Sequence, residues 1–116
     1  MHPILVVDDE QAIAMLIRRI LTDAGYRCEA VTDSIKAADL LEKKQYDLVL
    51  LDIMMPGMDG ITAMAKLREF SNIPVILLTA KSEDSDKILG LSVGADDYIT
   101  KPFNPVEVLA RVKSQL

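Results

Sequence analysis

The stretch ILVVDDE, residues 4–10, passes directly from four apolar side chains to three acidic ones. A second run has the same form, because the apolar residues 48–51 are followed by Asp52. Residues 75–78 form a third strong apolar run, and residues 28–31 and 98–99 form weaker ones. Apolar runs of this length without polar alternation are typical of strands buried on both faces, as in a parallel sheet.

Segments with helical spacing lie between these runs. The clearest, residues 13–21, repeats apolar side chains at helical intervals and is expected to stop at Gly25. Near the other end of the chain, Asn104 is a candidate N-cap, Pro105 the first helical residue and Glu107 a capping-box partner. Strands alternating with helices predict an α/β fold, namely a doubly wound five-stranded parallel sheet with five helices in a three-layer sandwich.

Length and composition narrow the class of protein. The 116 residues fit one domain, residues 1–116, and the 50% hydrophobic content indicates a packed core. A formal net charge of −5 disfavours direct binding to nucleic acid or anionic membranes. One cysteine, no apolar run long enough to cross a membrane and no export signal lead us to expect a cytoplasmic protein without a membrane partner.

Polar side chains gather where the predicted strands end. Asp8 and Asp9 follow the first run, Asp52 another, Thr79 the run at residues 75–78, and Lys101 the last. Each has an ordinary reading on its own, as a helix cap, a turn residue, a loop hydroxyl or a solvated surface charge. Together they are expected at one edge, because the carboxyl ends of parallel strands meet where such folds bind ligands.

Clustered carboxylates need a counter-charge, and oxygen-only ligands favour Mg²⁺ over softer metals. A lysine and a threonine hydroxyl in the same pocket can bind anionic oxygens. This set of groups predicts a site for phosphoryl transfer, which mainly requires positioning and neutralisation of charge.

Four segments resemble the receiver domains of bacterial two-component response regulators. They are ILVVDDE (4–10), LVLLDIMMPGMDG (48–60), PVILLTA (74–80) and GADDYITKPF (94–103). The resemblance covers essentially the whole chain and implies a flavodoxin-like fold with strand order 2-1-3-4-5. It also implies phosphorylation by a sensor histidine kinase, with Mg²⁺, or Mn²⁺ in its place, as the cofactor.

The resemblance assigns roles to individual residues. Asp52 is the expected phosphoacceptor, and Asp8, Asp9, Asp52 and the backbone carbonyl of Met54 the expected metal ligands. Thr79 and Lys101 are expected to bind the phosphoryl oxygens. The family implies that the Lys101–Pro102 peptide is cis and that Thr79 and Tyr98 form a switch acting on the fourth helix, fifth strand and fifth helix.

The C-terminal part resembles the OmpR/PhoB-type transcriptional regulators, with a likeness to vancomycin-resistance-type regulators. In these proteins the face formed by the fourth helix, fifth strand and fifth helix pairs two copies after phosphorylation. DNA binding belongs to a C-terminal domain that is not among these 116 residues. The chain is therefore read as an excised receiver, with a stand-alone receiver as the alternative. The charged residues that match the dimer face are Lys87, Asp96, Asp97, Glu107 and Arg111.

Three other functions remain as alternatives. An aspartyl-nucleophile phosphatase would need a second aspartate two residues after Asp52, where this chain has Met54. A flavin site would need small or hydroxyl residues after the first strand, where Asp8, Asp9 and Glu10 would repel phosphate. A degenerate receiver that acts only through protein–protein contacts would not need the complete polar set.

Overall fold

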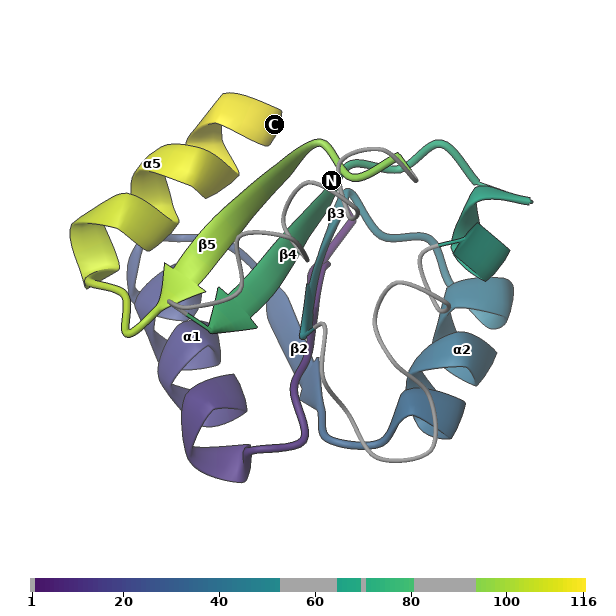
Figure 1. The fold of residues 1–116 in the computed structure, drawn as a ribbon, viewed down its shortest axis with the longest axis horizontal. Coiled ribbons are helices and arrows are strands. Elements are labelled where there is room, and N and C mark those ends of the chain that lie inside the picture. The colour runs from purple at the N-terminus through teal and green to yellow at the C-terminus, as the bar shows by residue number, and fades with distance from the viewer. Residues whose placement is uncertain (1, 53–64, 70, 81–93) are drawn as a thin grey trace.

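The computed structural model describes residues 2–52, 65–69, 71–80 and 94–116. Five strands form one sheet in the order β2-β1-β3-β4-β5, and every neighbouring pair is parallel (Figure 1). The predicted parallel sheet and its strand order are confirmed. The strands are β1 (Ile4–Val7), β2 (Cys28–Val31), β3 (Leu48–Asp52), β4 (Val75–Ala80) and β5 (Asp97–Lys101).

Helices cover both faces of this sheet. The labelled helices are α1 (Gln11–Asp23), α2 (Ser34–Lys43) and α5 (Pro105–Gln115), and residues 65–68 are also helical. In Figure 1, α1 and α5 lie on one side of the sheet, and α2 lies on the other. Residues 53–64 and 81–93, where the rest of the third helix and the fourth helix are expected, lie outside the described residues. The predicted count of five helices is therefore not confirmed.

Local signals set the helix ends in three places, and the two at Gly25 and Asn104 were expected from the sequence. Gly25 has a φ of +97°, a left-handed conformation that glycine adopts without strain, directly after α1. The Asp33 side chain accepts a hydrogen bond from the Ile35 N–H and caps α2. The Asn104 side chain accepts one from the Glu107 N–H, with Pro105 in the first turn of α5.

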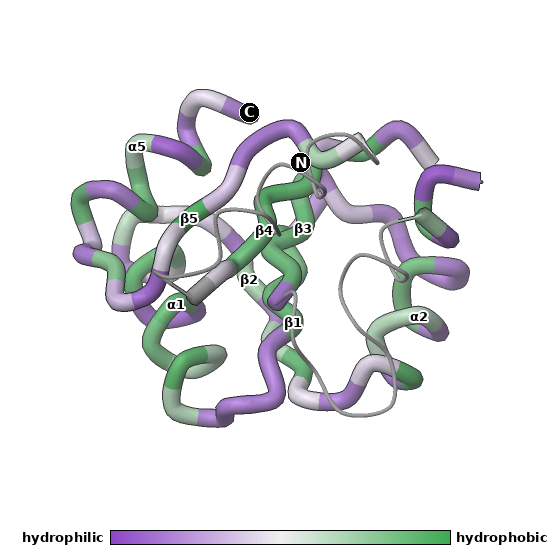
Figure 2. The backbone as a smooth tube through the Cα atoms, viewed as in Figure 1, coloured by the Kyte–Doolittle hydropathy of each residue, from purple (hydrophilic) through white to green (hydrophobic). Residues whose placement is uncertain are grey.

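The strands bury both of their faces, so alternate residues enter two separate cores. In β1, Leu5 and Val7 pack on the α2 side, whereas Ile4 and Val6 pack on the side of α1 and α5. Figure 2 shows the hydrophobic strands at the centre of the molecule. Two-sided burial explains why these strands have unbroken apolar sequences instead of alternating ones.

One residue of the expected apolar face of α1 is placed differently. Ile17 and Leu21 are fully buried, but Leu16 is 47% exposed. The buried stripe of α1 runs through Ala14, Ile17 and Leu21, and Leu16 lies beside that stripe. Apolar character at helical spacing therefore overestimated the width of the buried face.

No helix within the described ranges is long and apolar enough to cross a bilayer.

This difference between two leucines of one helix can be measured. We expect Leu21→Ala to lower the free energy of unfolding by about 2–5 kcal/mol, because it opens a cavity in a closed core. Leu16→Ala is the matched control and should cost less than about 1 kcal/mol, because much of this side chain already contacts water. Urea denaturation of both variants tests this assignment, and equal losses would contradict it.

Candidate functional site

The strand register brings the polar residues to one edge of the sheet. Val7, the residue before Asp8, pairs with Leu51, and Asp52 pairs with Leu78. Thr79 comes next in β4, and Lys101 is the last residue of β5. Asp52, Thr79 and Lys101 thus lie within their strands instead of following them. The ladder of backbone hydrogen bonds extends past the apolar residues, so sequence hydropathy alone placed the strand ends too early.

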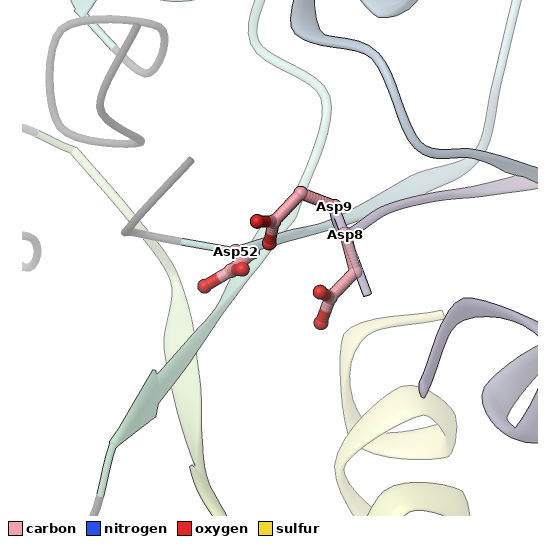
Figure 3. A group of neighbouring side chains, drawn as sticks. All are labelled: Asp8, Asp9 and Asp52. Atoms are coloured by element: carbon pink, nitrogen blue, oxygen red, sulfur yellow. The ribbon is translucent and has the colours of Figure 1, made fainter. Parts of the chain in front are cut away.

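Three carboxylates meet at this edge (Figure 3). One oxygen from each of Asp8, Asp9 and Asp52 lies within 4.8 Å of the other two. Asp8 is fully buried and Asp52 is 5% exposed, whereas Asp9 faces solvent. The sequence-based prediction that these three side chains lie together is confirmed. Like charges at this range repel, so the cluster requires positive charge nearby.

Lys101 supplies part of that charge from the far side of the pocket. Its Nζ is 2.8 Å from Asp8 Oδ2 and 3.6 Å from Asp52 Oδ2. Burial alone would lower the pKa of Lys101, but the contact with Asp8 and the charges of Asp52, Asp8 and Glu10 together raise it above the ordinary value. The ammonium is therefore the stable form at neutral pH, and it is shared among several carboxylates.

Asp8 is held from two directions. Its Oδ1 accepts a hydrogen bond from the Glu10 N–H at 3.0 Å, and its Oδ2 faces the Lys101 ammonium. The N-cap position of α1 is Glu10, so the alternative reading of Asp8 or Asp9 as the N-cap residue is wrong. The backbone contact to Asp8 stabilises the turn that leads from β1 into α1 and directs the carboxylate towards the pocket.

Thr79 is a buried hydroxyl without a hydrogen-bond partner among the described residues. It is 1% exposed, and its Oγ1 lies in the interior beside the acidic edge. A buried hydroxyl that makes no hydrogen bond costs free energy, so this position favours a ligand that brings an oxygen to it. Asp8, Asp52 and Thr79 are also the only buried polar or charged residues in the described ranges.

The group as a whole fits a hard divalent cation. Asp8, Asp9 and Asp52 offer oxygen ligands only, and within the part of the chain that the structure describes the Lys101 ammonium alone faces them, which leaves an excess of negative charge. Mg²⁺ prefers such ligands and retains room for water or phosphate oxygens. Met54, whose carbonyl was expected as a further ligand, lies outside the described residues.

The residues expected to form the switch and the dimer face lie around β5. The Lys101–Pro102 peptide bond is cis, and Tyr98 is half-buried. Arg111 Nη1 contacts both carboxylate oxygens of Asp97, at 2.8 and 3.0 Å, and Arg111 Nε lies 3.4 Å from Glu107 Oε1. Lys87, the remaining member of the expected face, lies outside the described residues.

Asp96, expected in the dimer face, makes hydrogen bonds within its own chain. Its Oδ2 accepts hydrogen bonds from Arg68 Nη2 and from the Val75 N–H, both at 2.9 Å. Arg68 also donates to the carbonyl oxygen of Gly94 through Nε and Nη2. Asp96 therefore joins the start of β4 to the segment before β5, whether or not it also takes part in a contact between copies.

The sequence analysis gave no role in these contacts to two residues, Glu10 and Arg68. Glu10 Oε1 lies 3.9 Å from Lys101 Nζ and adds a fourth carboxylate to the pocket. Its position directly after Asp8 and Asp9 was the available signal. Arg68, which binds carbonyl oxygens of three residues as well as Asp96, gave no signal, because one arginine in a helix is usually a surface residue.

Curated proteins with similar sequences include a regulatory protein and a transcriptional regulatory protein. The chain is 50% identical over 113 residues to the regulatory protein VanRc of Enterococcus gallinarum, an alignment that covers 97% of this chain and 49% of the relative. It is 47% identical over 116 residues to the transcriptional regulatory protein YvrH of Bacillus subtilis (strain 168), covering 97% of this chain and 48% of that protein. The chain thus spans about half the length of these curated relatives.

Solved structures agree with the sequence comparison. The receiver domain of the Francisella response regulator 1452 superposes with a TM-score of 0.92 at 37% identity, covering 99% of this chain and 96% of that one. The chemotaxis protein CheY4 of Vibrio cholerae gives a TM-score of 0.90 at 31% identity, covering 100% and 99%. The family model described as the response regulator receiver domain matches residues 4–113. With this sequence, this fold and this acidic edge, the chain belongs to the receiver domain family of two-component response regulators.

Proposed function

We propose that Asp52 accepts a phosphoryl group from a phosphohistidine of a sensor histidine kinase. The observation that carries this proposal is the order of side chains along the sheet edge. Asp52 ends β3, between β1, which leads to Asp8, and β4, which carries Thr79. A phosphoryl group on Asp52 would have carboxylates on one side and, on the other, the Thr79 hydroxyl, which has no partner among the described residues.

The neighbouring carboxylates are less suited to this role. Asp8 is fully buried and engaged by the Glu10 N–H and by Lys101. Asp9 faces solvent, where its carboxylate would lack the buried hydroxyl. Asp52 is also near Lys101, at 3.6 Å, so the added negative charge would lie beside an ammonium.

In this proposal Asp8, Asp9 and Asp52 hold Mg²⁺, or Mn²⁺ in its place. The bound cation would neutralise charge on the transferred group and orient its oxygens. Lys101 and Thr79 would bind the phosphoryl oxygens, the first through its ammonium and the second through its hydroxyl. Phosphoryl transfer needs positioning and charge neutralisation more than a general base, which agrees with the residues present.

We further propose that Thr79 and Tyr98 couple phosphorylation to the face formed by β5, α5 and the expected fourth helix. Occupation of the phosphate site would favour one of two pre-existing arrangements of this face and so promote a symmetric homodimer. Transcriptional regulation and DNA binding would belong to the longer protein, in the half that its curated relatives have and this chain does not span.

Two alternatives remain open to experiment. A stand-alone receiver would pass the signal through protein–protein contacts only. An aspartyl-nucleophile phosphatase would release phosphate repeatedly from a small substrate, but Met54 stands where its acid–base aspartate would be. We propose stoichiometric phosphorylation of the domain as its chemistry, with no metabolite turnover.

Phosphorylation at Asp52 is testable with acetyl phosphate and Mg²⁺. We expect one phosphoryl group per chain by intact-mass spectrometry and none in Asp52→Ala. EDTA should reduce the rate by at least about tenfold, because no cation then offsets the developing charge. Asp39→Asn, an exposed α2 residue paired with Lys43, is the matched control and should behave as wild type. Labelling that persists in Asp52→Ala would refute the assignment.

The counter-charge role of Lys101 has a pH signature. In EDTA at pH 7, Lys101→Met should lower the free energy of unfolding by about 2–4 kcal/mol, because buried Asp8 loses its partner. The pKa of Lys101 is raised in the folded protein. Its contribution is therefore complete below the pKa of an unfolded lysine, about 10.4, and is lost as the pH rises through the folded value.

Urea titrations of wild type and Lys101→Met between pH 7 and 11.5 measure that difference. It should stay constant up to about pH 10 and then shrink. Lys43→Met is the control, because Lys43 is exposed and its ion-pair partner among the described residues is Asp39 of α2. A difference between wild type and Lys101→Met that grows with alkaline pH would contradict the role.

The dimer face can be tested with beryllofluoride, a phosphate mimic, in the presence of Mg²⁺. We expect the mimic to shift sedimentation from monomer towards dimer. Glu107→Ala should weaken that dimer by roughly fivefold or more, because two-fold symmetry repeats each lost charge contact. Glu42→Ala on α2 should leave it unchanged. A monomer that persists with the mimic bound would remove the dimer from the proposal.

A further inference from the structure

β5 is the last strand in the order of the sheet, and its side chains alternate between the two cores. Ile99 belongs to the core under α1 and α5, whereas Tyr98 packs against the core on the α2 side. By the same alternation Asp97 points to the side of Ile99. Asp97 and Tyr98 are therefore neighbours in sequence that lie on opposite faces of the sheet.

One side chain of α5 contacts both of them. Arg111 Nη1 binds both carboxylate oxygens of Asp97, and Arg111 Cζ lies 5.7 Å from the centroid of the Tyr98 ring. A group that touches residues on both faces must pass around the free edge of β5. The Asp97 Oδ1 atom also accepts from the Tyr98 N–H at 2.8 Å, so the carboxylate is fixed against the strand.

We propose that Arg111 is a positioning residue that couples the orientation of the Tyr98 ring to the position of α5. While the guanidinium is bound to Asp97, its positive charge faces the ring and stabilises the ring in the orientation seen here. When Arg111 is drawn away, that stabilisation ends and the ring is freer to turn inward. This inference rests on the proposed switch role of Tyr98.

The strength of these contacts suits a switch. Arg111 and Asp97 are only partly buried, with side chains 37% and 18% exposed, so water and competing carboxylates can reach the pair. A cation–π contact at such a site changes an equilibrium by about two- to fivefold, which biases the ring without locking it. A carboxylate of a second copy that binds Arg111 would release Tyr98, so dimer formation and ring rotation would favour each other.

The test uses protein labelled with 3-fluorotyrosine. The chain has three tyrosines, and Tyr98→Phe identifies the ¹⁹F resonance of Tyr98. Without beryllofluoride, this resonance should move in Arg111→Gln and in Asp97→Asn, which removes the charged partner of Arg111 on β5 and leaves the longer contact to Glu107. Arg19→Gln removes the same charge from an exposed pair on α1 and should leave the resonance in place.

A beryllofluoride titration with Mg²⁺ present, followed by amide NMR, gives a midpoint concentration for each variant. This midpoint shows whether Arg111 affects the switch equilibrium or only changes the charge near the Tyr98 ring. At a protein concentration that keeps wild type and variants monomeric, we expect Arg111→Gln to reach half-saturation at a beryllofluoride concentration about two- to fivefold lower than wild type, because the ring orientation seen here has lost its support. Arg111→Lys retains the cation and should fall between the two. Asp97→Asn should also lower the midpoint and serves as the second route if Arg111→Gln folds poorly.

The outcomes separate this inference from the proposed function. A wild-type domain that does not respond to beryllofluoride would refute the proposed function. A wild-type domain that responds, with Arg111→Gln and Asp97→Asn at the same midpoint, would overturn only the role of Arg111. Equal shifts in Arg111→Gln and Arg19→Gln would also overturn it, because they would show a general effect of charge.

Discussion

The ion pair between Lys101 and Asp8 is the interaction on which the acidic edge depends. It joins the end of β5 to the residue after β1, across β3 and β4, with a fully buried carboxylate at one end. Three carboxylates share this ammonium, since Asp52 and Glu10 also lie within 4 Å of it, and Asp9 lies close to Asp8 and Asp52. Without the ammonium, the parallel sheet would hold these acids together against their mutual repulsion. The pair thus lets the sheet keep an excess of negative charge at the edge where a cation and a phosphoryl group are proposed to bind.

The arrangement of the sheet was predictable because its strands are buried on both faces. Runs such as residues 4–7 and 48–51 have no solvent side, and that condition is visible in sequence as unbroken apolar character. The strand ends were harder to predict from the sequence. Backbone pairing extends β3, β4 and β5 to include the polar residues Asp52, Thr79 and Lys101. The exposure of Leu16 has a similar origin. Helical spacing predicts which residues can share a face, but the neighbouring elements decide how wide a face they cover.

The sequence predicted which residues lie together at the sheet edge, but it did not predict which of them form ion pairs or hydrogen bonds with each other. The topology places the carboxyl ends of parallel strands together, so the sequence was sufficient to group Asp8, Asp52, Thr79 and Lys101. Which carboxylate lies closest to the ammonium depends on the rotamers of a long side chain, which sequence does not specify. The same holds for Arg68, whose contacts to Gly94, Ile73 and Asp96 arise only when three separate segments meet. The contacts of long cationic side chains are therefore the part of this structure that the sequence predicts least well.

The excess of acid at the site has a thermodynamic consequence. Adding a phosphoryl group to Asp52 increases negative charge in a pocket that already has four carboxylates near one ammonium. A cation held by Asp8, Asp9 and Asp52 would lower that charge, and it would share Asp8 with Lys101. Each event therefore changes the free energy of the other, and the cation and the phosphoryl group should bind with positive coupling. In the proposed function, Asp8 would help to hold the cation, and the Lys101 ammonium would then be available to bind phosphoryl oxygens. Lys101 therefore offsets the charge of Asp8 and Asp52 in this structure, and the proposed function would give the same ammonium a second role, which the acidic Asp8 could not fill.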